Sequence, residues 1–391
     1  MPEYSNFNHA LCACQCYEAV FLYFSCFESY GYYKIPSMKL SVPFIPDEKY
    51  TNFLKNKTRN IESVYFSLHS GQVLDSRMRC KTATPHELSK GLQHLKSVKK
   101  YCLLNSRFIN PNLYHDTQFL NQTLDKLEYL VSHANINGIV FCDAYFLNAL
   151  SATKRDITGF LEAVPGINFM IDSYQKAASM FEFIRQTRFK FPKKIVLDRS
   201  LNRNIRQLEK TGSEIKKAGN QIKIELLANE GCIYHCPFKL THDAQISFSN
   251  TGLIPDKSFQ TNLTIGCHAW FYKTPANFLK SPFIRPEDID MYTQTADTIK
   301  LCGRTLGVNF LYKCISAYVE KSYNGNLFNL MDATHWLSDV YHIENKKLDP
   351  GFFKLLTSCT KNCKNCNVCR DLFLKTARQK PFKLKQYKDY L

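Results

Sequence analysis

No apolar run in this sequence is long enough to cross a membrane. The densest apolar stretch, residues 11–27, is interrupted by Gln15 and Glu18, and no Lys or Arg precedes Lys34. A membrane-spanning helix needs about 20 apolar residues, and a secretory signal begins with basic ones. We therefore expect no membrane span and a soluble, cytoplasmic protein.

Several catalytic motifs are also missing. The sequence contains no His-Glu-x-x-His of a zinc metallopeptidase and no Gly-x-Ser-x-Gly of a serine hydrolase. At Cys232 and Cys236 the Cys-x3-Cys-x2-Cys triplet of radical S-adenosylmethionine enzymes is not completed, because Cys236 is followed by Pro-Phe-Lys. The peptidase chemistry that stays open is a cysteine nucleophile, Cys236 beside His235 or His242.

Cysteine, by contrast, is abundant, with 16 in 391 residues. A secreted disulfide-linked domain would be smaller and would space its cysteines throughout the chain. Clustered cysteines favour metal, because thiolates are soft ligands suited to zinc and iron–sulfur clusters. The two groups that we expect to bind metal are Cys232, Cys236 and Cys267, and Cys359, Cys363, Cys366 and Cys369.

The C-terminal group, Cys359-x3-Cys363-x2-Cys366-x2-Cys369, packs four thiols into eleven residues. Structural zinc sites usually consist of two separated pairs, whereas this run is similar to ferredoxin spacing written in reverse order. We expect a 4Fe–4S cluster on these cysteines, with zinc as the alternative.

The other group supplies three thiols and leaves one ligand position to fill. Cys302, in the last expected strand, is one candidate for that position. A C-terminal cysteine is another, and the two groups would then share one cluster instead of holding two. An iron left open to substrate or water would make the site catalytic.

The net charge is +17, from 51 basic and 34 acidic residues. Such an excess favours an anionic partner such as RNA, and a basic tail follows the last cysteine. The abundance of Lys, Asn, Ile, Tyr and Phe supports the alternative that the charge only reflects a lysine-rich composition. Both interpretations stay open.

Short apolar runs alternate with longer amphipathic stretches from Lys39 onward, which predicts a repeated strand–helix pattern. The predicted strands are residues 39–44, 63–68, 100–104, 138–142, 167–173, 194–200, 222–229 and 298–304. Predicted helices include residues 117–132, 174–187 and 201–218. Eight such units predict an α/β fold, a TIM-like (β/α)8 barrel, with a cysteine-rich insertion after strand 7 and a cysteine-rich C-terminal extension. A doubly wound sheet is the runner-up, although no glycine-rich phosphate turn follows the first strand.

Polar residues at the strand ends of a barrel meet at one mouth, where TIM barrels place their catalytic groups. The residues expected there are His69, Asn105, Asp143, Asp172, Asp198, Arg199, Glu230 and Arg304. From these we take Glu230, Asp172 and Arg304 as the catalytic candidates.

The chain is predicted to divide into three parts. Residues 1–37 are aromatic and cysteine-rich without a clear period. We interpret them as a mis-assigned extension before a true start at Met38, with a poorly ordered arm as the alternative. Residues 38–325 are expected to form the barrel, and residues 326–391 hold the C-terminal cysteines and the basic tail.

Five segments together resemble the collagenase-like U32 peptidases. They are Asn229-Glu-Gly-Cys232-x3-Cys236-Pro-Phe, Gly266-Cys267, the helix start at 281–288, Ile299-Lys-Leu-Cys-Gly-Arg304 and Tyr323-Asn-Gly-Asn-Leu327. Their order and spacing match that family over about residues 38–370. The resemblance implies a TIM-like barrel in which Cys232, Cys236 and Cys267 ligate an iron–sulfur cluster. The usual fourth cysteine would lie near Ile289, where this chain has none, so Cys302 or the C-terminal run substitutes, or the cluster differs.

The resemblance also implies an activity. Better-understood members look like oxygen-independent hydroxylation factors that act on tRNA or ribosomal RNA bases or on a ubiquinone precursor. Some of them work as paired subunits and draw the hydroxyl group from prephenate. We therefore expect an iron–sulfur enzyme that modifies an RNA base or a small aromatic or prenylated substrate, with a paired subunit of the same family or RNA as partner. A peptidase and a non-catalytic iron–sulfur or RNA-binding subunit are the alternatives.

Overall fold

The computed structural model describes residues 38–77, 83–219 and 221–381. The predicted N-terminal extension, residues 1–37, and the last part of the basic tail lie outside the described residues. From Met38 onward the described chain belongs to one compact unit. Within this part of the chain, no helix combines the length and the apolar character that a membrane crossing requires.

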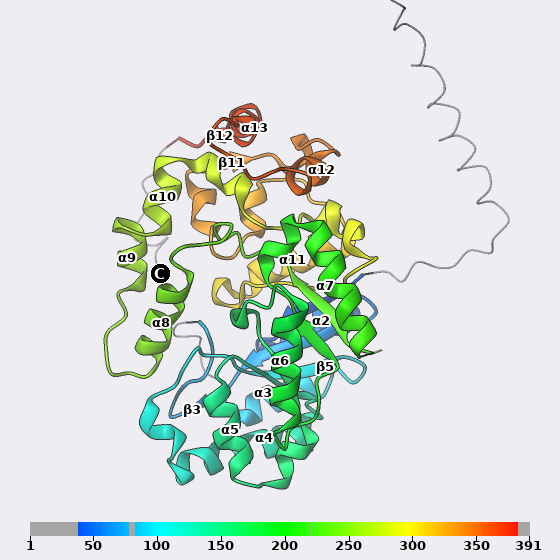
Figure 1. The fold of residues 1–391 in the computed structure, drawn as a ribbon, viewed down its shortest axis with the longest axis vertical. Coiled ribbons are helices and arrows are strands. Elements are labelled where there is room, and N and C mark those ends of the chain that lie inside the picture. Colours follow the sequence, from blue (N-terminus) through cyan, green and yellow to red (C-terminus); the bar gives the residue numbers. More distant parts are fainter. Residues whose placement is uncertain (1–37, 78–82, 220, 382–391) are drawn as a thin grey trace, which may run out of the picture. The chain divides into compact units, whose positions relative to one another are not determined.

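Eight parallel strands form a barrel, and the chain passes through them in order around its circumference (Figure 1). They are β1 (Lys39–Pro43), β2 (Ile61–Ser67), β5 (Lys99–Leu104), β6 (Gly138–Phe141), β7 (Glu162–Pro165), β8 (Lys194–Val196), β9 (Lys223–Leu227) and β10 (Thr298–Lys300). β1 pairs with β2 on one side and with β10 on the other, so the first and last strands are neighbours. Between β7 and β8, the Lys190 N–H donates to Leu161 (2.9 Å) and the Lys190 carbonyl accepts from Ala163 (3.1 Å). The barrel is therefore nearly closed, which confirms the predicted fold class.

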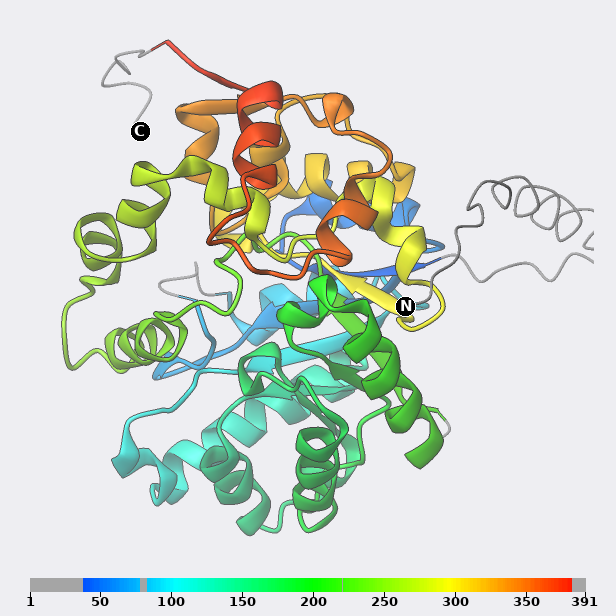
Figure 2. The same ribbon diagram turned by 45° about the horizontal axis from the view of Figure 1, so that its top comes forward.

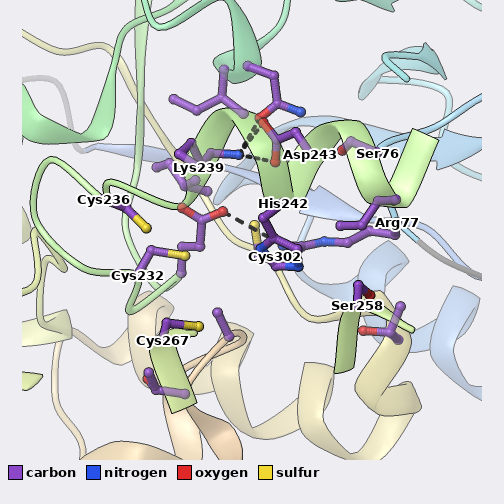
Figure 3. Close-up of a pocket in the computed structure, with 18 of the residues that line it drawn as sticks. Ser76, Arg77, Cys232, Cys236, Lys239, His242, Asp243, Ser258, Cys267 and Cys302 are labelled. Carbon is purple, nitrogen blue, oxygen red and sulfur yellow. Dashed lines mark hydrogen bonds and ion pairs between the residues drawn. The ribbon is translucent and has the colours of Figure 1, made fainter. Parts of the chain in front are cut away.

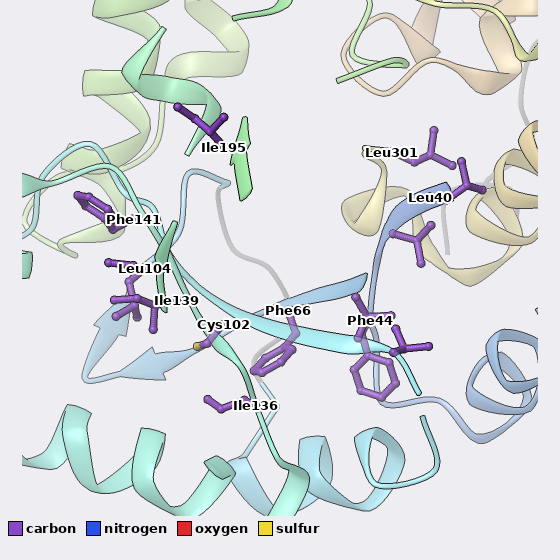
Figure 4. Close-up of a cluster of buried hydrophobic side chains, with 14 of the residues drawn as sticks. Leu40, Phe44, Phe66, Cys102, Leu104, Ile136, Ile139, Phe141, Ile195 and Leu301 are labelled. Carbon is purple, nitrogen blue, oxygen red and sulfur yellow. The ribbon is translucent and has the colours of Figure 1, made fainter. Parts of the chain in front are cut away.

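Side chains alternate along each strand between the barrel interior and the surrounding layer, as the two-residue period of a strand requires. On β5, Tyr101 and Leu103 pack in the interior cluster, whereas Cys102 and Leu104 belong to the large outer core. Figure 4 shows part of that outer core, where strand side chains meet the helices. The helices that follow the strands are α2 (Glu48–Asn56), α3 (Pro85–Leu92), α4 (Thr117–Ala134), α5 (Ala144–Ala152), α6 (Tyr174–Arg185), α7 (Ile205–Ala218) and α11 (Gly307–Glu320).

One predicted strand is wrong. The fifth strand is β7 (Glu162–Pro165), whereas the predicted segment 167–173 begins with a short 3-10 turn, η3 (Ile167–Phe169). The buried Glu162 carboxylate accepts hydrogen bonds from the Tyr101 hydroxyl (3.1 Å) and the Lys193 N–H (3.2 Å). These contacts come from distant segments, so this strand cannot be recognised from the hydrophobic pattern of its own residues.

The segments outside the barrel share a second hydrophobic core. The insertion after β9 contains α8 (Lys239–Asn250), α9 (Ser258–Thr264), α10 (Cys267–Lys273) and η5 (Pro275–Lys280), and the C-terminal part contains β11 (Tyr341–Ile343), α12 (Phe352–Thr357), α13 (Val368–Thr376) and β12 (Ala377–Gln379). Phe271 and Phe278 of the insertion pack in one cluster with Phe328 and Phe373. In Figure 2 the orange and red C-terminal segment lies against this insertion.

Glu225 and two lysines form a buried charge cluster in the barrel interior. Glu225 on β9 lies between Lys194 (2.9 Å) and Lys300 (3.2 Å). Each ammonium group also lies over an aromatic ring, Lys194 over Tyr101 (4.2 Å to the centroid) and Lys300 over Tyr65 (4.0 Å). Burial alone would raise the pKa of Glu225, but the two lysines outweigh it and lower the pKa to about 2. The carboxylate therefore stays ionised at neutral pH.

Glu225→Gln would leave Lys194 and Lys300 buried without their shared carboxylate, and we expect a loss of about 3–5 kcal/mol in unfolding free energy. The native pKa is depressed from 4.5 to about 2, so this stabilisation is present above pH 4.5 and is lost as the pH falls toward 2. Urea denaturation at several pH values measures both effects. The control Glu209→Gln, on an exposed position of α7, should change the unfolding free energy by no more than about 0.5 kcal/mol. Equal stability of Glu225→Gln and the wild type at pH 7 would contradict this account of the interior.

Candidate functional site

A pocket of about 360 Å³ opens at the carboxyl ends of the barrel strands, where TIM barrels carry their active sites. Its walls come from the loops after β4 (Gln72–Val73), β9 and β10 and from the insertion helices α8 to α10. Figure 3 shows the side chains that project into it. A pocket of this volume suits a small ligand.

Asn229 fixes the loop that carries the first two cysteines. It is fully buried at the end of β9. Its side-chain NH2 donates to the carbonyl oxygens of Cys302 (3.1 Å) and Leu330 (2.9 Å), and its side-chain oxygen accepts from the Cys302 N–H (2.6 Å). One amide thus joins the ends of β9 and β10 to the C-terminal segment.

Gly231 turns the chain between Glu230 and Cys232. Its φ is +75°, and a Cβ atom there would lie 2.3 Å from Oγ1 of Thr334. Its carbonyl oxygen accepts a hydrogen bond from the Ser281 hydroxyl (3.1 Å). Both the left-handed conformation and the close approach of Thr334 require glycine at this position.

Cys232, Cys236 and Cys267 all line the pocket, and Figure 3 shows their sulfur atoms around the same space. The first two follow β9, and Cys267 is the first residue of α10. Burial, with Cys236 adding to its effect, raises the pKa of Cys267 to about 11. Burial also raises the pKa of Cys232 and, to a smaller extent, that of Cys236. These groups are therefore neutral thiols at pH 7, and a metal that binds them must displace their protons.

The three thiols fit an iron–sulfur cluster better than a single ion. Among the described residues, no three His, Cys, Asp or Glu side chains are spaced to hold one metal ion. A 4Fe–4S cluster binds each thiolate through a different iron atom, so its ligands lie further apart than those of one ion. The donor type also fits, because thiolates are the usual ligands of such clusters.

Cys302 lines the same pocket from the end of β10. Burial, together with the neighbouring Asp332, raises its pKa to about 11, and the other charges that act on it include Arg77 and Glu230. The structure thus brings Cys302 into the pocket but among charged side chains. The four C-terminal cysteines do not belong to the pocket lining.

Glu230 forms the centre of a buried charge network. It pairs with Arg199 and lies 4.0 Å from Arg77, which also pairs with Asp332. Burial alone would raise the pKa of Glu230, but Arg199, followed by Lys239 and Arg77, holds it below its ordinary value. Glu230 is therefore an ionised acceptor at neutral pH and not a proton donor.

Other cations at the pocket are also held by carboxylates. Lys239 contacts Asp243 (2.6 Å), which in turn pairs with Arg107 (3.1 Å). Arg304 pairs with the buried Asp75 (2.9 Å). These contacts orient positive side chains that a ligand in the pocket can reach.

The predicted catalytic residues divide into two groups. Glu230 and Arg304 line the pocket, together with the predicted mouth residue Asn105. Asp172 does not line it, and its carboxylate pairs with Lys176 at the start of α6 (2.9 Å) with 43% of the side chain exposed. Asp172 was expected at the mouth because segment 167–173 was predicted as a strand, so the two errors have one cause.

The remaining mouth candidates have structural roles or lie elsewhere. Asp143 accepts a hydrogen bond from the Phe146 N–H at the start of α5 (3.1 Å), and Asp198 accepts one from Ser200 (2.9 Å). His69 lies in the short strand β3 (His69–Ser70) and is exposed.

Sequence reasoning missed four charged residues of the pocket, namely Arg77, Lys239, Asp243 and Lys300. Arg77 follows a short hairpin of β3 and β4 inside the loop after β2, which the strand–helix pattern did not reveal. Lys239 and Asp243 stand four residues apart at the start of α8. That spacing, typical of a helical ion pair, was the signal available in the sequence.

The fold and the pocket define a TIM-like barrel protein with a thiol-lined site at the carboxyl ends of its strands. No protein-family model matches the chain. A protein described as an uncharacterized protease of Methanocaldococcus jannaschii is 32% identical over 187 residues, which make up 48% of this chain and 54% of that relative. The match thus spans about half the length of the relative.

Comparison with solved structures gives more distant likenesses. A structure described as the U32 peptidase Mk0906 has 15% identity and a TM-score of 0.43, over 67% of this chain and 92% of that one. An α-amylase from Malbranchea cinnamomea has 9% identity and a TM-score of 0.30, over 50% and 61% of the two chains. Such low TM-scores have no bearing on function. The chain is thus similar to a protein described as a protease and, more distantly, to a solved structure described as a U32 peptidase.

Two glycine substitutions separate backbone strain from crowding at the cysteine loop. Gly231 and Gly252 both have φ near +75°, but a Cβ at Gly252 meets nothing within 4 Å. Gly252→Ala should therefore cost about 1–2 kcal/mol in unfolding free energy from strain alone. Gly231→Ala should cost about 1–3 kcal/mol more, because Thr334 must move. Urea denaturation compares the two, and equal costs would show that the loop does not depend on this contact.

Proposed function

We propose that the pocket holds an iron–sulfur cluster on Cys232, Cys236 and Cys267. The protein uses it as an enzyme, for an oxygen-independent hydroxylation or a related redox modification. The observation that carries the proposal is that three partly buried thiols from two separate segments line one pocket at the active-site end of a barrel. The similarity to the U32 peptidase family supports it.

When bound, the cluster would supply a redox-active iron with a ligand position for substrate. Three thiols leave that position open, and Cys302 is the competing fourth ligand because it lines the same pocket. We favour the open position, since Cys302 lies among Asp332, Arg77 and Glu230. Those side chains already occupy the surroundings of its sulfur atom.

The charged residues of the pocket would bind and orient the substrate. Glu230 is an ionised acceptor, held in place by Arg199, and suits a substrate hydroxyl or amino group. Arg304, the other catalytic candidate, is positively charged and suits an anionic group of the substrate. Asp172 is no longer part of the assignment, because it does not line the pocket.

The pocket favours a small anionic substrate or a single base. The charged residues of its lining are Arg77, Lys239, Lys300 and Arg304 against Glu230 and Asp243. This excess of cations attracts carboxylates or phosphates. A volume of about 360 Å³ accommodates a small aromatic molecule or one extruded RNA base. The net charge of +17 supports RNA through contacts with its phosphates.

A paired subunit of the same family is part of the proposal. Of the 15 exposed large hydrophobic residues in the described chain, nine lie between Leu240 and Tyr272, in the insertion that borders the pocket. Such a concentration on one segment is typical of a surface that contacts another protein.

A peptidase is the second candidate, because the relative is described as an uncharacterized protease. Activated cysteine nucleophiles have lowered pKa values, whereas those of Cys236 and Cys267 are raised. In addition, no hydrogen bond joins a cysteine to a histidine within residues 38–77, 83–219 and 221–381. Both observations favour the cluster.

Removal of the pocket thiols tests the proposal. The full chain, purified anaerobically, should be brown and contain iron and sulfide in about equal amounts, about four of each per cluster. Cys232→Ser/Cys236→Ser should lose the pocket's share of both, because two of three ligands are gone. Iron and sulfide analysis with electron paramagnetic resonance measures the loss.

The matched control is Cys142→Ala, which removes a buried thiol outside the pocket and should keep the full iron content. A wild-type chain without iron would sink the cluster assignment. Cleavage of gelatin or peptides that continues after the iron is removed would establish the peptidase instead.

A further inference from the structure

The four C-terminal cysteines occupy a loop that the pocket does not use. The loop runs from α12 to the first turn of α13. All four side chains are free thiols, with Cys363 and Cys366 exposed and Cys359 and Cys369 partly buried. The resemblance to the U32 peptidases assigns no role to this run.

The backbone of the loop already folds around Cys359. Lys361 adopts a left-handed conformation, with φ +61°, and its N–H donates to Sγ of Cys359 (3.3 Å). The Lys361 carbonyl then accepts from the Cys363 N–H (3.1 Å). The turn therefore already orders the backbone around the sulfur atom of Cys359.

A buried cation beside the loop has no carboxylate partner within the described part of the chain. Arg203 is 4% exposed, and its two NH2 groups donate to the carbonyl oxygens of Leu279 (2.9 Å) and Leu356 (3.3 Å). Its Nε–H has no hydrogen-bond partner among the described residues. The strongest negative charges that act on it are those that Cys369 and Cys359 would carry as thiolates.

A buried guanidinium without a counter-charge is costly, by several kcal/mol even after relaxation. Its carbonyl partners satisfy hydrogen bonds but bring no negative charge. Thiolates at Cys359 and Cys369 would supply that charge. A thiolate becomes the stable form of cysteine when it binds a metal.

We propose that Cys359, Cys363, Cys366 and Cys369 form a second metal centre, separate from the pocket, whose negative charge Arg203 neutralises. Four thiolates suit an iron–sulfur cluster or zinc, the two soft centres that such a set binds. Their placement within eleven residues, without two separated pairs, favours the cluster.

A single ion such as zinc would require a local change, because the described residues contain no three ligands already spaced for one ion. Its binding would draw Cys363 and Cys366 toward Cys359 and Cys369. Because the first two are exposed, this movement breaks no core packing. The Lys361 ammonium group donates a hydrogen bond to the Arg203 carbonyl oxygen (2.7 Å). This contact holds the start of the loop in place when the metal binds.

The loop also lies next to the wall of the pocket. Arg203 is 5.9 Å from the centroid of the Tyr234 ring, and Tyr234 lies between Cys232 and Cys236 in the chain. Cys369 packs against the same hydrophobic cluster as Cys236. The C-terminal cysteines therefore lie near the loop that carries Cys232 and Cys236.

The test compares metal content in full-length variants purified anaerobically. Cys363→Ser/Cys366→Ser changes only exposed side chains, so the fold should be kept. We expect it to lose one centre, either about four irons with sulfide or about one zinc, and to retain the metal of the pocket. Elemental analysis distinguishes the two metals. Asn365→Ser, an exposed change in the same loop, should lose neither.

Cys232→Ser/Cys236→Ser should show the reverse pattern and keep the C-terminal metal. If the loop variant matches the wild type in iron, sulfide and zinc, the second centre does not exist. If the pocket variant loses nothing while the loop variant loses metal, the second centre stands and the proposed function fails.

Arg203→Met tests the charge balance separately. Without the cation, the C-terminal metal should be removed by a chelator several-fold faster, and Arg203→Lys should restore much of the wild-type rate. An unchanged rate in a folded Arg203→Met chain would show that Arg203 only supports the loop sterically and does not neutralise a metal centre.

Discussion

The pocket depends on the side-chain amide of Asn229. This buried group bonds to backbone atoms at the ends of β9 and β10 and to Leu330 in the C-terminal segment. An amide is suited to this role because it donates and accepts at once. With these three segments joined, Gly231 can turn the chain so that Cys232 faces the pocket and not the barrel core. The position of Cys232 at the pocket is therefore set by contacts of its own loop.

Many buried ions in the molecule contact an ion of opposite sign. Glu225 contacts two lysines inside the barrel, and Glu230 pairs with Arg199 at the mouth. Arg203 is a buried cation outside this pattern, since its hydrogen bonds go to carbonyl oxygens. Buried charges of one sign are costly in a medium of low polarity, so an unbalanced one marks a place where a further charge belongs.

Much of the fold follows from local sequence patterns. The apolar runs of the barrel strands are dense enough to predict seven of the eight, and Cys232, Cys236 and Cys267 stand out as one of the cysteine clusters of the sequence. The strand β7 escaped because it depends on partners from distant segments. Asp172 was misplaced for the same reason. Arg77 reaches the pocket through a hairpin inside a loop, and hydrophobic periodicity says nothing about such loops.

The central claim is that three soft ligands share a cluster at the mouth of the barrel. Crystals of the anaerobically purified chain, measured at X-ray energies on both sides of the iron absorption edge, test it most directly. The account predicts an iron signal between the sulfur atoms of Cys232, Cys236 and Cys267. Ordered thiols with no iron signal between them, in crystals of a chain that retains its iron elsewhere, would contradict it.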